Sequence, residues 1–517
     1  MANRLVFDIG SKNCKCAIGS DNDELLAIES NRPLVLCSED GFCRCYDPSS
    51  FWNEILDLAR RTIKKSRIPA SEIKYVTCSS IRPSCVFVDS NGALMYIGSS
   101  FDLRGIHAAD TVEAAFEKAS GKSFFKATGH FPILMYPPAR YAWYRENEPA
   151  SFKRIAKYLP VDSWILGMFG AEEHANVASA AESGFYDIEA RDWGQEWPEI
   201  LQLPPDFFPP VVDSGEIVGD VSREARQALG LPNDAVVVSG MPDTQAALVG
   251  AGCIDELDAA IVVGSTTPVQ VLKRELYLDD KARVWTTMFN LKSVVDTYVV
   301  EASTGITGQL LVWLGGLLFN KDGKFKREDL AAIDEEYELF DAEETARPAD
   351  GRDVLAFLGP DVLASSSNTI VPGAFVFPTP GTVDEAILAR RQLVAATFEN
   401  IQFAAYKNLE FLRNIRHFNA GRTFLLGGVT RSATFCQRFA DLSNTLVYST
   451  VEKEPTISGL FHTCSVAAGD IKNGIDLKQK IESRAGLVTM APRPGSAEAL
   501  RSRYSKWLIM REKIKGL

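Results

Sequence analysis

Apolar and polar residues follow a distinctive order at the start of the chain. An apolar run over residues 5–9 carries Asp8, a polar turn follows over residues 10–15, and a second apolar run covers residues 16–18. Strand, turn and strand at this spacing predict a β-hairpin. Its tip presents backbone N–H groups, hydroxyls and lysines that can bind a phosphate, with a carboxylate beside them for a metal.

The same pattern recurs in the second half of the chain. The apolar residues 259–263 lead into a glycine and three hydroxyl residues at 264–267, and residues 269–272 are again apolar. Two such hairpin tips in two halves of one chain predict a phosphate held between two related domains.

The remaining periodicities predict a mixed α/β protein. Expected strands cover residues 73–77, 85–88, 93–97, 235–240 and 423–426. Expected helices cover residues 51–63 (capped by Ser49 or Ser50), 244–250, 392–411, the segment from Thr434, and 502–513. We expect a hairpin turn at 89–92, a loop or linker at 203–210, and a charged surface excursion at 321–352.

Size and composition narrow the function classes. A chain of 517 residues exceeds one ordinary core, so we expect two domains, residues 1–253 and 254–517. The net charge of −12 disfavours a nucleic-acid partner. The sequence contains no run of about 18 apolar residues, so we expect no membrane span. The N-terminal residues lead straight into a strand without a signal-peptide pattern, so we expect a cytoplasmic protein.

Ten cysteines are scattered along the chain, two pairs of them in Cys-x-Cys spacing at 14/16 and 43/45. In a reducing cytosol, free thiols are the expected state. Cys14 and Cys16 would share one face of a strand, so a zinc site is the alternative, although none of the five histidines has ligand spacing with them.

Asp243 is the main candidate for catalysis. It follows a buried β-branched strand and Gly240, where a helix of small residues begins. A capping aspartate is one interpretation. A general base that takes the proton from a substrate hydroxyl during phosphoryl transfer is the other, and the glycine-polar turn about twenty residues later favours it.

Other residues fit a nucleotide site. Asp8 can hold Mg²⁺, which takes one or two carboxylates, and Lys15 adds positive charge beside phosphates. The turn residues 264–266 offer N–H groups and hydroxyls to a γ-phosphate. The glycine pairs 305/308 and 427/428 allow close backbone approach to an adenine and ribose, although close helix–strand packing also explains them. Walker-type and dinucleotide-binding glycine patterns are absent from the sequence.

Several motifs in one order resemble the FGGY carbohydrate kinases of the actin-like ATPase superfamily, over roughly residues 4–475. The matching segments are the first phosphate motif at 8–15, the catalytic-aspartate segment at 240–252, the second phosphate motif at 264–266, the Gly-x-x-Gly helix at 305–313, the adenosine motif at 427–441 and the closing helix at 454–469. The resemblance implies two ribonuclease-H-like α/β domains around a deep cleft, with ATP and Mg²⁺ as cofactors.

The resemblance also implies residue roles. Asp243 would be the base, and Asp8 and Asp243 would hold the metal. Arg82, Asp102 and Asp243 would bind a small sugar or polyol, with Arg104 completing an Asp-x-Arg motif. The implied nucleotide-binding residues are Ser11, Lys12, Asn13, Lys15, Gly264, Ser265, Thr266, Gly305, Gly308, Gly427, Gly428 and Ser432.

The chain departs from the family pattern at several places. Ser11 replaces the usual threonine, Lys12 stands where a second threonine is common, and Val429 stands where a third glycine is frequent. Pro83 replaces an acidic residue beside Arg82, and a Gly-Glu-Arg segment is missing near residues 358–360. Within the family the chain looks most like the autoinducer-2 kinases, whose substrate is a linear five-carbon dihydroxydione.

The sequence therefore predicts an ATP-dependent kinase of a small polyhydroxylated substrate. The departures leave a second hypothesis, a catalytically weak ATP-binding sensor or scaffold that keeps the fold. A chaperone-type ATPase shares the nucleotide motifs, but no separate peptide-binding segment stands out in the sequence. A homodimer is the base-rate expectation for the oligomeric state.

Overall fold

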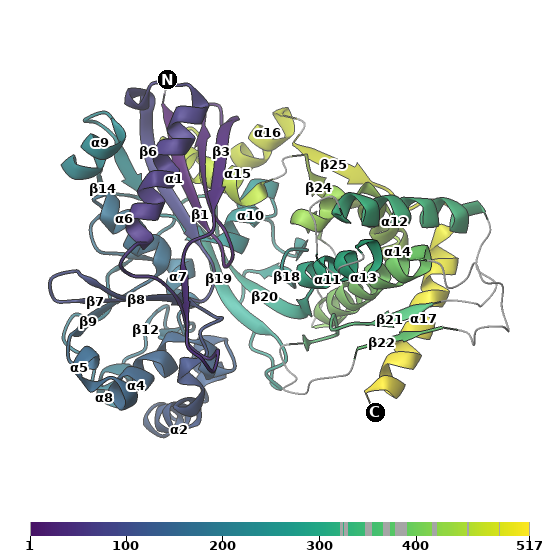
Figure 1. Cartoon of the computed structure of the whole chain (residues 1–517), viewed down its shortest axis with the longest axis horizontal. Helices are drawn as coiled ribbons and strands as arrows, with labels where there is room; N and C mark the ends of the chain where they lie inside the picture. The colour runs from purple at the N-terminus through teal and green to yellow at the C-terminus, as the bar shows by residue number, and fades with distance from the viewer. Residues whose placement is uncertain are drawn as a thin grey trace. The chain divides into compact units, whose positions relative to one another are not determined.

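The computed structural model describes residues 2–320, 324, 329–346, 354–364, 373–377, 390–415, 421–451, 454–484 and 486–515. The chain forms two compact units that interleave along the sequence (Figure 1). Unit 1 comprises Met1–Ile254, Lys273–Val299 and Glu454–Ser483, and unit 2 comprises Asp255–Leu272, Val300–Lys453 and Arg484–Leu517. The domain boundary between residues 253 and 254 stays a prediction.

Unit 1 is built on a mixed seven-stranded sheet. The strands are β1 (Asn3–Ile9), β2 (Cys14–Gly19), β3 (Leu25–Asn31), β6 (Ile73–Ser80), β14 (Ile217–Asp220), β15 (Val236–Val238) and β16 (Met241–Pro242). Their order is β3-β2-β1-β6-β15-β14, with β16 also pairing with β6. Strands β1, β2 and β3 are antiparallel neighbours, whereas β6 runs parallel to β1 and to β15. The predicted first hairpin is confirmed.

Alternation along β1 assigns a different layer to each face of this sheet. Leu5, Phe7 and Ile9 pack into one core with the helices α1 (Phe51–Ser66) and α6 (Val161–Phe169). Arg4 points to the other face, where its Nη2 donates to the Ser465 hydroxyl of α15 (Pro455–Ala467). The helix α10 (Asp243–Ala251) packs against α15. Even-numbered residues of β1 therefore face the α10/α15 layer.

Unit 1 also contains an aromatic-rich core around a second, five-stranded antiparallel sheet. Its strands, in spatial order, are β4 (Val35–Cys37), β5 (Arg44–Tyr46), β8 (Leu94–Ser99), β7 (Ser84–Asp89) and β9 (Ile155–Leu159). The hairpin turn predicted at 89–92 joins β7 to β8 and is confirmed. The predicted loop at 203–210 is not a linker, because its Phe207 is buried against Phe87, Tyr141 and Phe185.

The remaining elements of unit 1 are short, apart from α2 and α4. The helices are α2 (Ala109–Ser120), α3 (Phe124–Thr128), α4 (Pro137–Asn147), α5 (Pro149–Phe152), α7 (Val177–Ala181), α8 (Trp197–Leu201), α9 (Arg223–Leu229) and α16 (Gly474–Ser483). The strands are β10 (Ala175–Asn176) paired with β13 (Val211–Val212), β11 (Tyr186–Asp187) paired with β12 (Asp192–Trp193), and β19 (Trp285–Leu291). Unit 1 thus combines a sheet that carries the first hairpin with a substantial second subdomain.

Unit 2 repeats the strand order of the unit 1 sheet. Its strands are β17 (Ala259–Val262), β18 (Thr266–Lys273), β20 (Val295–Ile306, whose residues up to Val299 belong to unit 1), β23 (Thr423–Leu426), β24 (Val447–Thr450) and β25 (Leu487–Met490). Their order is β20-β18-β17-β23-β24-β25, with β17/β18 antiparallel, β17/β23 and β23/β24 parallel, and β24/β25 antiparallel. In each unit the first strand of a hairpin pairs antiparallel with the second strand and parallel with a third strand, β6 or β23. This confirms the predicted repeat and the mixed α/β class.

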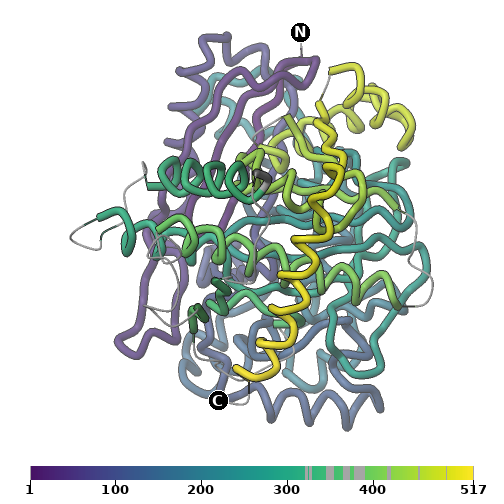
Figure 2. The backbone as a smooth tube through the Cα atoms, turned by 90° about the vertical axis from the view of Figure 1, so that its right-hand side faces the viewer, coloured from purple at the N-terminus to yellow at the C-terminus, as the bar shows by residue number. Residues whose placement is uncertain are grey.

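The helices of unit 2 are α11 (Gly308–Phe319), α12 (Asp329–Ala346), α13 (Arg390–Asn414), α14 (Ala433–Ser443) and α17 (Ser496–Ile514), beside a small sheet of β21 (Leu355–Phe357) and β22 (Ala374–Val376). Figure 2 shows α17 as one unbroken yellow helix at the C-terminus. Trp507 of α17 is buried against Phe357 and Phe403, as the apolar face predicted for residues 502–513 requires.

Two local predictions need correction. Within the predicted surface excursion at 321–352, α12 buries Tyr337, which stacks on Phe398 at 4.4 Å between ring centroids. The charged residues of α12 conceal this apolar face in the sequence. Of the residues 321–352, the structure describes Lys324 and 329–346, and the rest of the predicted excursion lies outside the described residues. Ser50 is the residue before α1, but its hydroxyl donates to Glu54 at 2.7 Å instead of capping a backbone N–H, since Ser50 already has helical dihedral angles.

The structure also bears on disulfides, metal-ligand clusters and membrane-spanning helices. None of the ten cysteines forms a disulfide, and within the described residues no cluster of three or more histidine, cysteine, aspartate or glutamate side chains could hold a metal ion. No helix in the described part of the chain is long and apolar enough to cross a lipid bilayer.

Candidate active site

Asp8 anchors a cluster of charges on the α10/α15 face of the unit 1 sheet. It is the last even-numbered residue of β1 before the hairpin turn, and the parallel register places Ser79 of β6 beside it. The Ser79 hydroxyl donates to Asp8 Oδ1 at 3.2 Å. Lys15 returns along β2 opposite Asp8, so that its Nζ lies 3.6 Å from Asp8 Oδ2 and 2.7 Å from Glu454 Oε2. One lysine thus faces two carboxylates.

Burial changes the acidity of this cluster. It raises the pKa of Asp8 above its ordinary value, although the Lys15 charge acts in the opposite direction. Burial alone would lower the pKa of Lys15, but the two carboxylates outweigh it and the pKa is raised. Lys15 is therefore a firmly charged ammonium at the base of the hairpin tip. The tip residues Lys12 and Asn13 are exposed, and Ser11 is partly exposed.

A pair of glycines brings α10 and α15 into unusually close contact. A Cβ atom at Gly250 would lie 2.0 Å from the carbonyl oxygen of Pro455, and one at Gly459 would lie 1.8 Å from that of Ala246. Only glycine permits backbones to approach this closely. The small residues that predicted a helix at 244–250 therefore serve to fix α10 against α15, and with it Asp243 at the start of α10.

Asp243 is the first residue of α10, and Pro242 occupies the N-cap position. The simple capping interpretation is therefore incomplete: the carboxylate accepts from the backbone N–H of the adjacent Thr244 at 2.7 Å. Burial and the negative charge of Asp8 raise the pKa of Asp243 to about 7, whereas Arg82 opposes the shift. A carboxyl group with this pKa can take up and release a proton near neutrality.

Arg82 is held beside this carboxyl group by a residue that the sequence did not single out. Its Nη1 donates to Glu182 Oε1 at 2.7 Å, and Gln245 Nε2 donates to the same oxygen at 3.2 Å. The other Glu182 oxygen lies 3.2 Å from His130 Nε2. Burial disfavours the charged form of Glu182, but the Arg82 charge and the hydrogen bonds with His130 and Arg82 together outweigh it and hold the pKa of Glu182 well below its usual range. In the kinase family that the sequence resembles, an acidic residue follows the arginine, but here that position is Pro83. Glu182, at the C-terminal end of α7, supplies a carboxylate beside Arg82 instead.

Asp102 and Arg104 form a buried pair in the second subdomain of unit 1. Arg104 Nη2 lies 2.8 Å from Asp102 Oδ2, and the Tyr96 hydroxyl donates to that oxygen at 2.9 Å. The Asp102 side chain has no exposed surface, and the Arg104 guanidinium lies over the rings of Tyr96 and Trp143. This arrangement shows a structural role for the pair, and the substrate contact of Asp102 stays a prediction.

In unit 2 the turn after β17 rests on the start of α11. The backbone N–H of Gly308 donates to the carbonyl oxygen of Gly264 at 3.0 Å, and the Thr307 hydroxyl donates to the same oxygen at 3.0 Å. A Cβ atom at Gly308 would lie 2.7 Å from that oxygen. The glycine at 308 therefore sets the position of the turn, whose Ser265 and Thr266 side chains are exposed.

The predicted adenosine motif contains a tight turn after β23. Gly427 has φ of +96° and packs against Val263, from whose carbonyl oxygen a Cβ atom would lie only 2.6 Å away. Gly428 is exposed, with no atom near the position of a Cβ. Ser432 caps α14 by accepting from the Phe435 N–H at 3.2 Å. Gly305 has φ of +87° at the end of β20. The nucleotide contacts of these four residues stay predictions.

Known kinases are similar to this chain over most of its length. The N-terminal domain model of the FGGY family of carbohydrate kinases matches residues 4–250. Residues 4–250 thus match the N-terminal domain of the FGGY family. YoaC of Bacillus subtilis (strain 168), named as a sugar kinase, is 26% identical over 446 residues, covering 86% of this chain and 85% of YoaC. The autoinducer-2 kinase of Salmonella choleraesuis (strain SC-B67) is 23% identical over 465 residues, covering 90% of this chain and 83% of that protein.

Solved structures of FGGY kinases share the fold. The xylulose kinase of Rhodospirillum rubrum gives a TM-score of 0.81 at 20% identity, with 99% of each chain covered. The glycerol kinase of Plasmodium falciparum with ADP gives 0.82 at 16% identity, covering 99% of this chain and 98% of that chain. These matches confirm the predicted two-domain actin-like ATPase fold.

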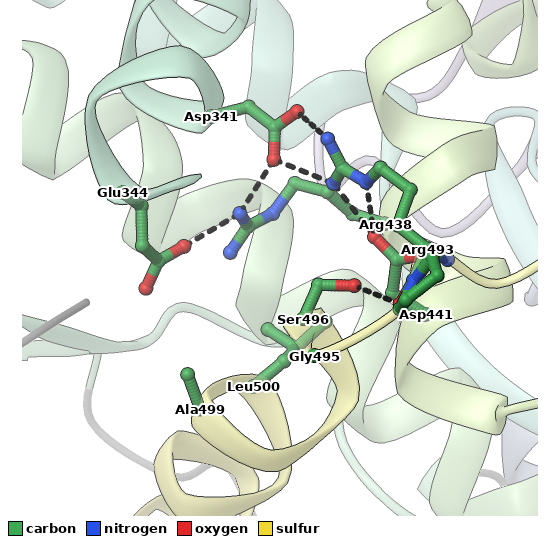
Figure 3. Close-up of a pocket in the computed structure, with 10 residues that line it drawn as sticks. Asp341, Glu344, Arg438, Asp441, Arg493, Gly495, Ser496, Ala499 and Leu500 are labelled. Atoms are coloured by element: carbon green, nitrogen blue, oxygen red, sulfur yellow. Dashed lines mark hydrogen bonds and ion pairs between the residues drawn. The ribbon is translucent and has the colours of Figure 1, made fainter. Parts of the chain in front are cut away.

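Unit 2 also contains an ionic cluster around a cavity of about 260 Å³, to which the end of the predicted adenosine motif contributes Arg438 and Asp441 (Figure 3). Arg438 of α14 donates to Asp341 at 2.9 Å and Glu344 at 2.6 Å, both on α12. Arg493, just before α17, lies 2.7 Å from Asp341 Oδ2 and 2.6 Å from Asp441 Oδ2. Carboxylates of the same unit pair with both guanidinium groups, although Arg438 Nε is buried without a hydrogen-bond partner, so the cluster links α12, α14 and the segment before α17.

The residues of this chain also fit a magnesium ion at Asp8 and Asp243. Ser79 of β6 pairs with Asp8 on one side and with Met241, two residues before Asp243, on the other, so the two carboxyl groups belong to neighbouring strand ends. Mg²⁺ keeps several waters and needs only one or two carboxylates beside substrate phosphates, so a dedicated cluster of protein ligands is unnecessary. Both metal-ligand assignments stay predictions.

Sequence reasoning missed several contributors. Glu182, His130 and Gln245 form the surroundings of Arg82, and Ser79 and Glu454 complete those of Asp8 and Lys15. A signal was present for Glu182, a single acidic residue that ends the apolar, small-residue segment 177–181. A charged residue in such a buried context needs partners, because an unpaired buried charge is costly.

Proposed function

We propose that this carbohydrate kinase transfers the γ-phosphoryl group of ATP to a hydroxyl group of a small sugar or polyol, with Asp243 as the general base. The observation that carries the proposal is the place of Asp243 at the first position of α10, which the glycine contact with α15 fixes, and the pKa of this carboxyl group, which burial and Asp8 raise to about 7, agrees with it. A base poised near neutrality accepts the hydroxyl proton as the oxygen attacks phosphorus.

The hairpin of unit 1 supports the phosphate-binding part of the proposal. Lys15 is charged and sits 3.6 Å from Asp8, so it can stabilise negative charge on the phosphates. A bound Mg²⁺ would supply further charge neutralisation on the transferred group. The turn residues Ser265 and Thr266 of unit 2 offer exposed hydroxyls, and we propose that they bind the same phosphate chain.

Exclusion of water is the remaining requirement of the proposed reaction. A kinase whose Asp243 activated water would hydrolyse ATP, and closure of the protein around both substrates prevents this in kinases generally. We therefore expect ATP turnover to depend strongly on the acceptor.

The test is a panel of acceptors assayed for ADP release with ATP and Mg²⁺, with the product identified by mass spectrometry. The panel contains xylulose, glycerol, gluconate, xylitol and the linear dihydroxydione precursor of autoinducer-2. We expect acceptor-dependent ADP release and a phosphate monoester of at least one compound. ATP binding without turnover on any acceptor would contradict the proposal and favour the sensor or scaffold.

A further inference from the structure

Glu182 is buried, and each of its two carboxylate oxygens has a hydrogen-bond partner. Oε1 accepts from Arg82 Nη1 at 2.7 Å and from Gln245 Nε2 at 3.2 Å, and Oε2 lies 3.2 Å from His130 Nε2. The residue is only 4% exposed. A side chain so enclosed and so fully engaged acts through its neighbours and not by touching a substrate.

The three partners of Glu182 come from separate parts of unit 1. Arg82 follows β6, His130 follows α3, and Gln245 lies two residues after Asp243 on α10. His130 is fixed in turn, because its Nδ1 lies 2.8 Å from the carbonyl oxygen of Thr128. The carboxylate therefore fixes the Arg82 guanidinium relative to the helix that carries Asp243.

The pairing also changes the electrostatics of the site. An arginine next to the catalytic carboxyl would ordinarily attract an anionic substrate such as a sugar acid. Here the Arg82 charge is already matched at 2.7 Å by a buried carboxylate whose pKa lies well below its usual range. An anion that displaced Glu182 from Arg82 would leave the buried carboxylate without its arginine partner, which is strongly unfavourable.

Uncharged hydroxyl groups do not meet this obstacle. A guanidinium has five N–H donors in a planar fork, and a hydroxyl can accept from one of them without displacing a carboxylate from another. The Arg82 charge is thus balanced before any acceptor binds.

Resting on the proposed kinase function, we propose that Glu182 is a specificity-determining positioning residue: it neutralises and orients Arg82 so that the enzyme accepts uncharged polyhydroxylated substrates and rejects sugar acids. Its carboxylate selects the substrate class, and Asp243 performs the chemistry.

The test compares acceptors of equal chain length that differ at one end, xylitol against xylonate and glucitol against gluconate, in the full-length enzyme. For the wild type we expect kcat/KM for the neutral compound to exceed that for the acid by about 100-fold or more, since rejection leaves a buried polar group unpaired. A wild type that prefers the acids would overturn the inference while leaving the kinase function intact.

Glu182→Gln keeps the shape of the side chain and removes its charge. We expect the neutral-to-acid ratio to fall at least about tenfold, mainly through a lower KM for the acid, because the Arg82 charge is no longer matched. Glu182→Asp, which keeps the charge, should restore part of the preference. The matched control Asp280→Asn removes an exposed carboxylate and should leave the ratio unchanged.

The outcomes separate the two levels of the proposal. A folded Glu182→Gln enzyme with an unchanged ratio would overturn the role of Glu182. If this variant fails to fold, the ratio is measured in Glu182→Asp, and a wild type without a preference for the neutral compound still overturns the inference. Absence of turnover on every acceptor would overturn the kinase proposal itself, and this inference with it.

Discussion

The ammonium nitrogen of Lys15 lies 2.7 Å from Oε2 of Glu454, a residue 439 positions later in the chain. The contact joins the first hairpin to the start of α15, whose glycine contact with α10 in turn fixes Asp243. It also leaves Lys15 between two carboxylates, because Asp8 is 3.6 Å away. Lys15 is therefore both an organiser of the cluster and its source of positive charge.

Replacement of Lys15 by methionine removes this charge and keeps the length of the side chain. We expect kcat/KM for ATP to fall by about 100-fold or more, comparable to the loss of one preorganised charge-stabilising donor. Initial rates at varied ATP with saturating acceptor measure the effect. Lys64→Met, an exposed lysine on α1, is the control and should change little. Equal rates for the Lys15 variant and the wild type would contradict the role of Lys15.

The raised pKa of Asp243 predicts the pH dependence of the reaction. A general base must be unprotonated, and the pKa of about 7 means that the protonated, inactive form dominates below pH 7. We expect log kcat/KM to rise with a slope of one up to about pH 7 and then level off. Because Asp8 raises this pKa, residual activity of Asp8→Asn should begin at lower pH. A flat profile between pH 5.5 and 8 would contradict the assignment.

Gly308→Ala tests the turn of unit 2. The added Cβ would lie 2.7 Å from the Gly264 carbonyl oxygen and 3.3 Å from Ser265 Cα, so the turn has to move. We expect ATP affinity, measured by calorimetry, to fall about tenfold while the protein stays folded. Gly167→Ala has open space around its added Cβ and provides the matched control. Unchanged ATP binding in Gly308→Ala would separate this turn from the nucleotide site.

Asp23 is the centre of a buried ionic network that stabilises unit 1. Its carboxylate lies 3.0 Å from Arg4 Nη1, 3.0 Å from His462 Nδ1 and 2.6 Å from Lys480 Nζ. Asp23→Asn leaves Arg4 buried without its main partner, so we expect unit 1 to lose about 3–5 kcal/mol of stability. Thermal unfolding measures the loss, and Asp57→Asn, in an exposed pair with Arg61, should have almost no effect.

The same network makes a second, pH-dependent prediction. Burial opposes ionisation of Asp23, but its hydrogen bond to His462 and the nearby cations hold the pKa well below the usual range. The folded state therefore binds this proton less readily than the unfolded state does. The stabilisation is fully present above the unfolded pKa of about 3.9 and is lost as the pH falls below it. The melting temperature is measured at several pH values below 4 for the wild type and for Asp23→Asn. An equal or smaller decrease in the wild type would contradict this prediction.

Much of the fold was predictable from local patterns. The apolar runs around residues 10–13 and 264–266 predicted both hairpins, because alternation and turn residues are local signals. Phe207 shows the limit: a segment rich in proline resembles a linker, yet an aromatic core formed by distant residues buries its phenylalanine. Tyr337 was missed on α12 for the same reason, since charged neighbours conceal a single apolar face.

Some residues of the candidate site could be predicted from the sequence, and others could not. Asp8, Lys15 and Asp243 were found because they belong to short motifs with recognisable spacing. Glu182 was not, since its relation to Arg82 spans 100 residues and exists only in the folded chain. The glycines at 250 and 459 were likewise invisible as a pair, because their function is the contact between two helices.

The central claim is that Asp243 is the base for phosphoryl transfer. Asp243→Asn keeps the size of the side chain and removes its ability to accept a proton. We predict that turnover of the best acceptor falls by a factor of about 10²–10⁴ while the dissociation constant for ATP changes less than about threefold. Retention of more than about a tenth of wild-type turnover would contradict the claim.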